Sequence, residues 1–193
     1  MNETYKAMTE CAAEAARVAG KVRKERLDGP TPCAEFDLRA LVNHWVLYTS
    51  HGLERRALKQ PIPEELLQRD FTAEDDWAAA YAAQLDRALA AWARPAAWEG
   101  EIPLGEGHSA DAPEIAAMIV KELAVHGWDV ARSIGEDFAL SDASAALVLA
   151  VVEEHGEIYR QYQGFAAPVA VPADAPLFTR ALALSGRDPH QTL

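Results

Sequence analysis

The chain has 193 residues, of which half are hydrophobic and a quarter charged, a composition that excludes a disordered or fibrous protein and favours one globular domain over residues 1–193. Acidic residues outnumber basic ones by 30 to 18, and the formal charge of −12 argues against general binding to nucleic acid or to anionic membranes, which needs clustered basic side chains. Alanine is the commonest residue, which predicts a mostly helical protein because alanine is the residue best tolerated inside helices.

Three helices are predicted in the first half of the chain, over residues 2–26, 38–58 and 73–93. The segment Asp28 to Pro32 contains one glycine and two prolines, which end the first helix. Asp37 is the expected N-cap of the second helix, and Thr72, three residues before Asp75, is the expected N-cap of the third.

Three more helices are predicted after a connection without helical period, over residues 112–134, 142–162 and 176–185. The connection, residues 96–110, is expected to hold a small strand pair around 99–104. Gly135 and Gly186 are suited to end helices, and Ser141 to begin one. The expected fold is all-α: a four-helix bundle with a crossover connection, a short C-terminal helix and an extended tail over 165–193.

The cysteines and the N-terminal residues bear on the cellular compartment. Residues 1–10 are polar and lack the apolar region of a signal peptide, and no stretch approaches the roughly 20 apolar residues of a membrane span. Cys11 and Cys33 are too few and too far apart for a disulfide framework. We therefore expect a cytoplasmic protein in which both cysteines are small buried apolar side chains.

Polar residues interrupt the apolar face of the helix predicted over 112–134. On a helical wheel Glu122, His126, Asp129 and Ser133 fall within about 60° of one another, on the side that also carries the helix's apolar residues. Burying an unpaired carboxylate is unfavourable, so a metal cation, a basic partner or a proton must compensate it.

The second predicted helix carries a matching feature, because His44 and His51 are two turns apart on its apolar side. In a bundle, His44 could meet Glu122 and His126 in the core. Two histidines and one glutamate with an open fourth position form the ligand set of a catalytic zinc site, and the same set suits nickel or iron. The alternative is a hydrogen-bonded core network without a metal. The order of the residues differs from the H-E-x-x-H pattern of zinc peptidases.

The segments TPCAEFDLRALVNH, which ends at His44, and ELAVHGWDVAR, which begins at Glu122, together resemble the DinB-like superfamily. The closest likeness is to its metal-binding branch, which is similar to the N-terminal domain of mycothiol-dependent maleylpyruvate isomerase. The tail is similar to the same branch over residues 168–175 and 185–189. The resemblance implies a four-helix bundle that holds zinc or nickel through His44, Glu122 and His126, with water completing the coordination.

The resemblance also implies a function, since characterised relatives include isomerases and S-transferases that use mycothiol or bacillithiol. It predicts a metal-dependent enzyme that activates a low-molecular-weight thiol for transfer to, or isomerisation of, a small electrophilic substrate. The alternative is a non-catalytic metal-binding or interaction module. The isomerase has a separate C-terminal domain that contributes to its active site, and fewer than thirty residues follow Gly164 here. We therefore expect the metal site and the thiol chemistry to carry over, but not the isomerase reaction itself. A homodimer is the expected oligomer.

Asp129 is expected either to orient His126 or to form an ion pair with Arg132 or Arg39. His51 is expected to be packed or hydrogen-bonded, with a fourth metal ligand or an acid or base near the metal as the alternative. For the other candidates the expectation is packing (Trp128), an exposed loop (His108), a solvated face (His155), packing or a substrate hydrogen bond (Tyr48), and aromatic surface (Tyr159, Tyr162).

Overall fold

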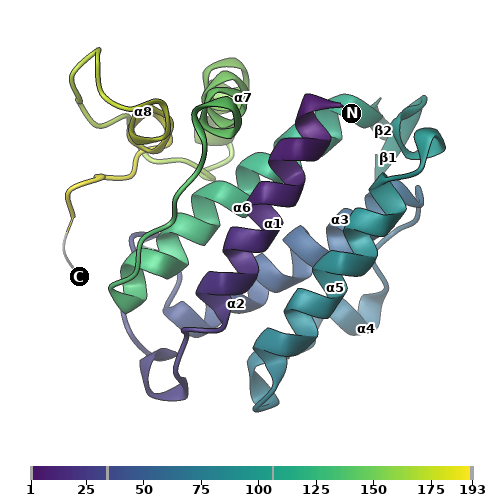
Figure 1. Ribbon diagram of the computed structural model, residues 1–193, viewed down its shortest axis with the longest axis horizontal. Coiled ribbons are helices and arrows are strands. Elements are labelled where there is room, and N and C mark those ends of the chain that lie inside the picture. The colour runs from purple at the N-terminus through teal and green to yellow at the C-terminus, as the bar shows by residue number, and fades with distance from the viewer. Residues whose placement is uncertain (1, 34, 106, 192–193) are drawn as a thin grey trace.

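The computed structural model describes residues 2–33, 35–105 and 107–191 and is mostly helical, with one small two-stranded sheet (Figure 1). Its bundle consists of α1 (Glu3–Ala19), α2 and α3 (Leu38–Val46 and Gly52–Ala57), α5 (Trp77–Trp92) and α6 (Ala112–Ile134). Helix α6 packs against α1, α2, α3 and α7, so it lies at the centre of the fold. Among the described residues no helix has the length and apolarity to span a membrane.

Two further helices lie outside the bundle on the α6 side. Helix α7 (Asp142–Gln161) packs against α1 and α6, and α8 (Leu177–Leu184) packs against α7 (Figure 1). The start and end signals of these helices act as predicted: the Ser141 hydroxyl accepts a hydrogen bond from the Ser144 amide, and Gly135 and Gly186 adopt positive φ after α6 and α8. The second half of the chain is therefore organised largely as its sequence predicts.

Two predicted helices in the first half have different bounds. The first helix ends at Ala19 instead of continuing to residue 26, and Lys24–Arg26 forms a separate 3-10 turn. The predicted N-cap Thr72 is wrong, because its hydroxyl donates to Asp70 at 2.7 Å within a 3-10 turn. Helix α5 consequently starts only at Trp77.

The helix predicted over 38–58 is interrupted by a π-helical turn, Leu47–His51, between α2 and α3. Asp37 caps α2 as predicted, accepting from the Ala40 amide at 2.8 Å. Within the turn, the Thr49 and Ser50 hydroxyls donate to the carbonyls four residues before them, both at 2.6 Å. Such hydroxyls compete with the backbone ladder, which gives a physical reason for the wider turn.

The strand pair is displaced from its predicted position. Strand β1 (Glu101–Gly105) pairs antiparallel with β2 (His108–Asp111), so the second strand lies beyond the predicted range of 99–104 and leads directly into α6. A short helix that was not predicted, α4 (Glu64–Leu67), follows the prolines after α3.

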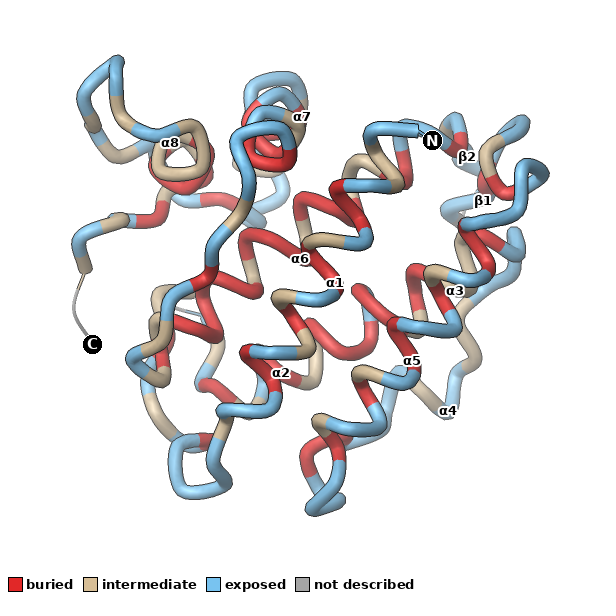
Figure 2. Tube along the Cα trace, viewed as in Figure 1, coloured by how far each residue is buried: buried red, intermediate tan, exposed pale blue. Residues whose placement is uncertain are grey.

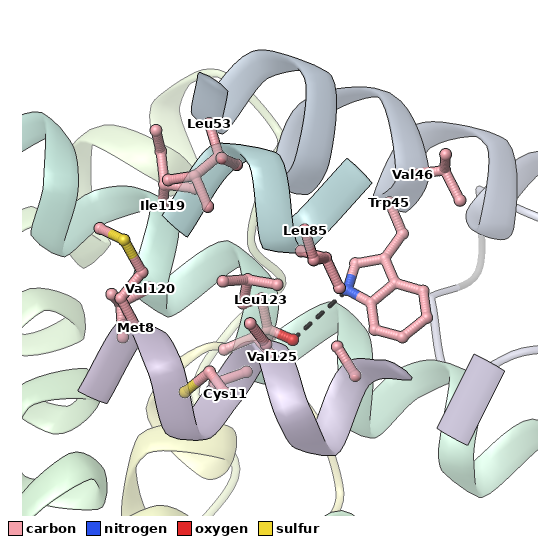
Figure 3. Close-up of a cluster of buried hydrophobic side chains, with 14 of the residues drawn as sticks. Met8, Cys11, Trp45, Val46, Leu53, Leu85, Ile119, Val120, Leu123 and Val125 are labelled. Atoms are coloured by element: carbon pink, nitrogen blue, oxygen red, sulfur yellow. Dashed lines mark hydrogen bonds between the residues drawn. The ribbon is translucent and has the colours of Figure 1, made fainter. Parts of the chain in front are cut away.

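The buried residues gather where the bundle helices face one another (Figure 2). In the core, Met8 and Cys11 of α1 lie beside Val120 and Leu123 of α6 (Figure 3). The Trp45 indole donates a long hydrogen bond, 3.4 Å, to the carbonyl of Leu123 (Figure 3). Because Trp45 and Leu123 are the direct neighbours of His44 and Glu122, this bond joins the two helices close to the candidate ligands.

Candidate metal centre

The structure brings His44, Glu122 and His126 together. One ligand atom from each residue can be chosen so that all three atoms lie within 4.8 Å of one another. Glu122 and His126 are one turn apart on α6, where His126 Nε2 is 3.2 Å from Glu122 Oε2. His44 faces them from α2, with its ring centroid 5.0 Å from that of His126. All three side chains are half-buried.

His126 is held from its other side by Asp129. The distance from His126 Nδ1 to Asp129 Oδ2 is 3.0 Å, and Asp129 is fully buried. Both nitrogens of the ring therefore face carboxylate oxygens. A neutral imidazole carries only one N–H, so a second proton or a cation must lie between Nε2 and Glu122.

Asp129 is paired with Arg187, which lies in the loop after α8. The guanidinium makes a forked contact, with Nε 3.2 Å from Oδ1 and the terminal nitrogen 2.9 Å from Oδ2. Asp129 thus contacts His126, the residue that one of its two predicted roles has it orient. Its predicted ion-pair partners were wrong: Arg39 pairs with Asp28, and Arg132 donates to the Gln191 carbonyl.

A buried lysine contacts the third candidate ligand. Lys121 is only 1 % exposed, and its ammonium pairs with Glu122 Oε1. The same ammonium lies 3.9 Å from the centre of the Tyr159 ring and 5.4 Å from that of Phe165. These aromatic faces stabilise the charge of Lys121 away from bulk water. Lys121 leaves Glu122 Oε2 facing His126.

Burial and the neighbouring charges set the protonation of each group. Burial lowers the pKa of His44 to about 4, and the nearby His126 adds to the effect, so His44 is neutral at pH 7. Burial opposes the charged forms of Glu122 and His126, but their neighbours outweigh it. Lys121 and His126 hold the pKa of Glu122 well below its usual range, whereas Asp129 and Glu122 raise the pKa of His126.

The candidate ligands line the wall of a cavity of about 630 Å³. The end of α7 and the segment that follows also line this cavity, including Tyr159, Arg160 and Phe165. A second cavity, of about 230 Å³, touches His44 and Glu122 from the side of α3. The three residues therefore face open space large enough for a small molecule.

A comparison with protein families matches residues 8–131 to the mycothiol maleylpyruvate isomerase N-terminal domain. The match spans almost two thirds of the chain and contains all three candidate ligands. The chain belongs to this family. Its fold is DinB-like, as predicted from the two sequence segments. Neither the curated proteins nor the solved structures contain a match.

Other candidate residues lie apart from this centre. His51 stacks on Phe71, with ring centroids 5.3 Å apart, and Trp128 is buried, so the packing predicted for both is confirmed. His108 is exposed on β2. His155 was expected on a solvated face, but its side chain is only 17 % exposed and its Nε2 lies 4.0 Å from Glu114.

Of the remaining aromatic and cysteine residues predicted from the sequence, one lies in the core and the others lie at the cavity or beside His44. Tyr48 lies against His44 with ring centroids 4.7 Å apart, and Tyr162 is exposed at the cavity rim. Cys11 is buried as predicted. Cys33 is only half-buried and lines the large cavity, which corrects its prediction as a buried side chain. Burial raises the pKa of its thiol, which is therefore protonated at pH 7.

Sequence reasoning missed Lys121 and Arg187. Lys121 directly precedes Glu122 and falls about 100° away on the wheel, so periodicity alone does not bring the two side chains together. Arg187 lies in the tail segment SGRDP, whose resemblance to this family was the only signal that it has a role.

Proposed function

We propose that this protein binds a divalent cation, zinc or nickel, through His44, Glu122 and His126, and that it is a metal-dependent enzyme acting on a small molecule. In this proposal it activates a low-molecular-weight thiol such as mycothiol for transfer to, or isomerisation of, an electrophilic substrate. The observation that carries the proposal is the position of three ligand-competent side chains on the wall of a large open cavity.

The protonation of these residues suits a cation. His44 is neutral, so one of its ring nitrogens carries a lone pair, and Glu122 is ionised. His126 donates through Nδ1 to Asp129, which directs Nε2 toward Glu122. A carboxylate that fixes the far nitrogen of a histidine is a regular feature of zinc sites. A cation between these donors supplies Lewis-acid chemistry, lowering the pKa of a thiol or water at an open position.

The charges around the site favour an anionic ligand. Lys121 and Arg187 balance the carboxylates of Glu122 and Asp129, and both histidines are neutral when they act as ligands. The charge of a divalent cation is therefore not neutralised by these four groups. A thiolate is preferred over a neutral thiol in such surroundings. The aromatic rings of Phe36, Tyr159 and Phe165 provide apolar surface in the same cavity for the rest of the ligand.

A non-catalytic metal-binding module is the alternative function. Such a module needs four ligands and no cavity beside them, since a structural zinc site is closed. The described residues place three candidate ligands at this point, next to open space. This arrangement supports the enzyme over the module.

Protein purified without a nickel column should contain about one zinc or nickel per chain by mass spectrometry. After exchange to cobalt(II), added mycothiol should produce a near-ultraviolet thiolate-to-cobalt absorption band. The S-methyl derivative of the same thiol, which cannot ionise at sulfur, should produce none. Absence of metal uptake would overturn the metal proposal, and uptake without a thiol band would favour the non-catalytic module.

Replacing Lys121 with Met should raise zinc affinity by about tenfold, because the ammonium and a divalent cation are like charges that share Glu122. The same change should lower the melting temperature of the metal-free protein, since Glu122 loses the buried ammonium that pairs with its Oε1 atom. Zinc competition against a chromophoric chelator and thermal unfolding measure the two effects. Lys6→Met removes an exposed lysine that pairs with Glu3 and should change neither. A weaker zinc affinity in Lys121→Met would contradict the interpretation.

A further inference from the structure

We propose that Arg187 is a positioning residue for the metal centre. It acts through Asp129 to fix the ring orientation and the tautomer of His126. The inference rests on the proposed metal site, but the contacts among Arg187, Asp129 and His126 that carry it are made by protein atoms without a metal ion. It also assigns a role to a segment that lies outside the family match over residues 8–131.

The contacts form one chain of buried polar groups. Arg187 is 5 % exposed and Asp129 is fully buried, and the two are joined by the forked contact at 2.9 and 3.2 Å. The Oδ2 atom of Asp129 is also 3.0 Å from His126 Nδ1. Because Arg187 holds both carboxylate oxygens, the carboxylate cannot rotate away from the imidazole without breaking an ion pair.

The local backbone delivers Arg187 to this position. Its amide donates to the Leu182 carbonyl at 3.0 Å, which fixes the loop directly after α8. The preceding residue, Gly186, has φ of +84°. A Cβ at Gly186 would lie 2.8 Å from the backbone of Ala166, so only glycine allows these two segments of the tail to approach this closely. The backbone of the tail therefore places the Arg187 guanidinium against Asp129, next to the candidate metal centre.

Stability alone does not account for this arrangement. A buried ion pair contributes little net stability, because desolvating the two charges offsets most of their attraction. The ion pair instead fixes the orientation of the Asp129 carboxylate relative to the His126 ring. With Asp129 fixed as an acceptor, His126 keeps its proton on Nδ1 and presents Nε2 to Glu122 and to the space beside His44. Outer partners of this kind change metal affinity by about 10- to 100-fold when removed.

A double-mutant cycle on Asp129 and Arg187 separates positioning from stability. Arg187→Gln and Asp129→Asn should each weaken zinc binding by about 10- to 100-fold. The double variant should bind zinc no more weakly than the weaker-binding single variant, because both residues act through one contact. Its melting temperature without metal should exceed those of both single variants, since neither charge is then left buried without a partner.

Arg160→Gln is the matched control. Arg160 lines the same cavity and also holds the tail, by donating to the Leu184 carbonyl at 3.2 Å, but the described contacts do not join it to Asp129. Its zinc affinity should equal that of the wild type. Wild-type affinity in Arg187→Gln would overturn the inference, as would recovery of affinity together with melting temperature in the double variant.

Nitrogen-15 NMR of the histidine side chains tests the same inference without metal. In the metal-free wild type, the His126 Nδ1 proton should be observed as hydrogen-bonded and slow to exchange, whereas Arg187→Gln should lose that signal. If the wild type takes up no zinc, the proposed function fails, and the NMR comparison alone decides the inference. An unchanged Nδ1 signal in Arg187→Gln would then overturn it.

Discussion

Replacing Glu122 with Gln should remove stoichiometric zinc binding while leaving the bundle folded. The substitution keeps the size of the side chain and removes the only carboxylate among the three candidate ligands. We expect zinc affinity to fall by more than about 100-fold, the largest effect usually seen for an outer partner of a ligand. The glutamine oxygen can still accept a hydrogen bond from Lys121, so no buried ammonium is left without a partner. Metal analysis after dialysis, together with circular dichroism, measures both expectations.

His44→Ala tests the site through a residue that is free of the ion-pair network. The described contacts of His44 are with the rings of Phe36, Tyr48 and His126, so its removal does not expose a buried charge. Zinc should be lost as in Glu122→Gln. His51→Ala is the matched control, because His51 comes from the same predicted helix and stacks on Phe71 instead. One zinc per chain in Glu122→Gln and His44→Ala would leave the three residues as a core network without a metal.

The proximity of the three candidate ligands, His44, Glu122 and His126, could be predicted because these polar residues interrupt apolar helix faces. Glu122 and His126 are one turn apart on the apolar face of a long helix, where the buried carboxylate charge must be compensated by a partner. The apolar face of another helix carries His44, which could meet them in the core. The helix ends near Gly135, Ser141 and Gly186 were predictable for a similar reason, since cap residues act through local backbone geometry.

What the sequence did not reveal depends on contacts between distant segments. The Asp129 side chain could have paired with any nearby arginine, and Arg187 is 58 residues away in the chain. The π-helical turn arises because two hydroxyls compete for carbonyls, which hydrophobic periodicity does not detect. Lys121 is buried because the rings of Tyr159 and Phe165 cover it. Tyr159 lies in the last turn of α7 and Phe165 in the segment after it, both more than 35 residues away in the chain.

Zinc affinity should increase with pH by about tenfold per unit until the imidazolium of His126 has lost its proton, and should then level off. In the metal-free protein Asp129 and Glu122 raise the pKa of His126, and zinc must displace the proton on Nε2. His44, with its pKa lowered to about 4, and Glu122, with its pKa held well below its usual range, are both deprotonated between pH 5 and 8 as a result. The slope should therefore correspond to one proton per zinc, and a slope of two or of zero would contradict this protonation scheme.

Stability should depend on pH in opposite ways with and without metal. A histidine whose pKa is raised by folding stabilises the protein fully below its unfolded pKa, about 6.5, and loses this contribution as pH rises through the folded value. The metal-free protein should therefore melt at lower temperature as pH increases from 6 through the folded pKa of His126. The zinc-loaded protein should gain stability over the same range, because zinc binds more tightly as the competing proton is lost. Melting curves of the two forms from pH 6 to 8 test this directly. The Asp129→Asn substitution removes one of the two carboxylates that raise the pKa of His126, so both trends should then occur at lower pH.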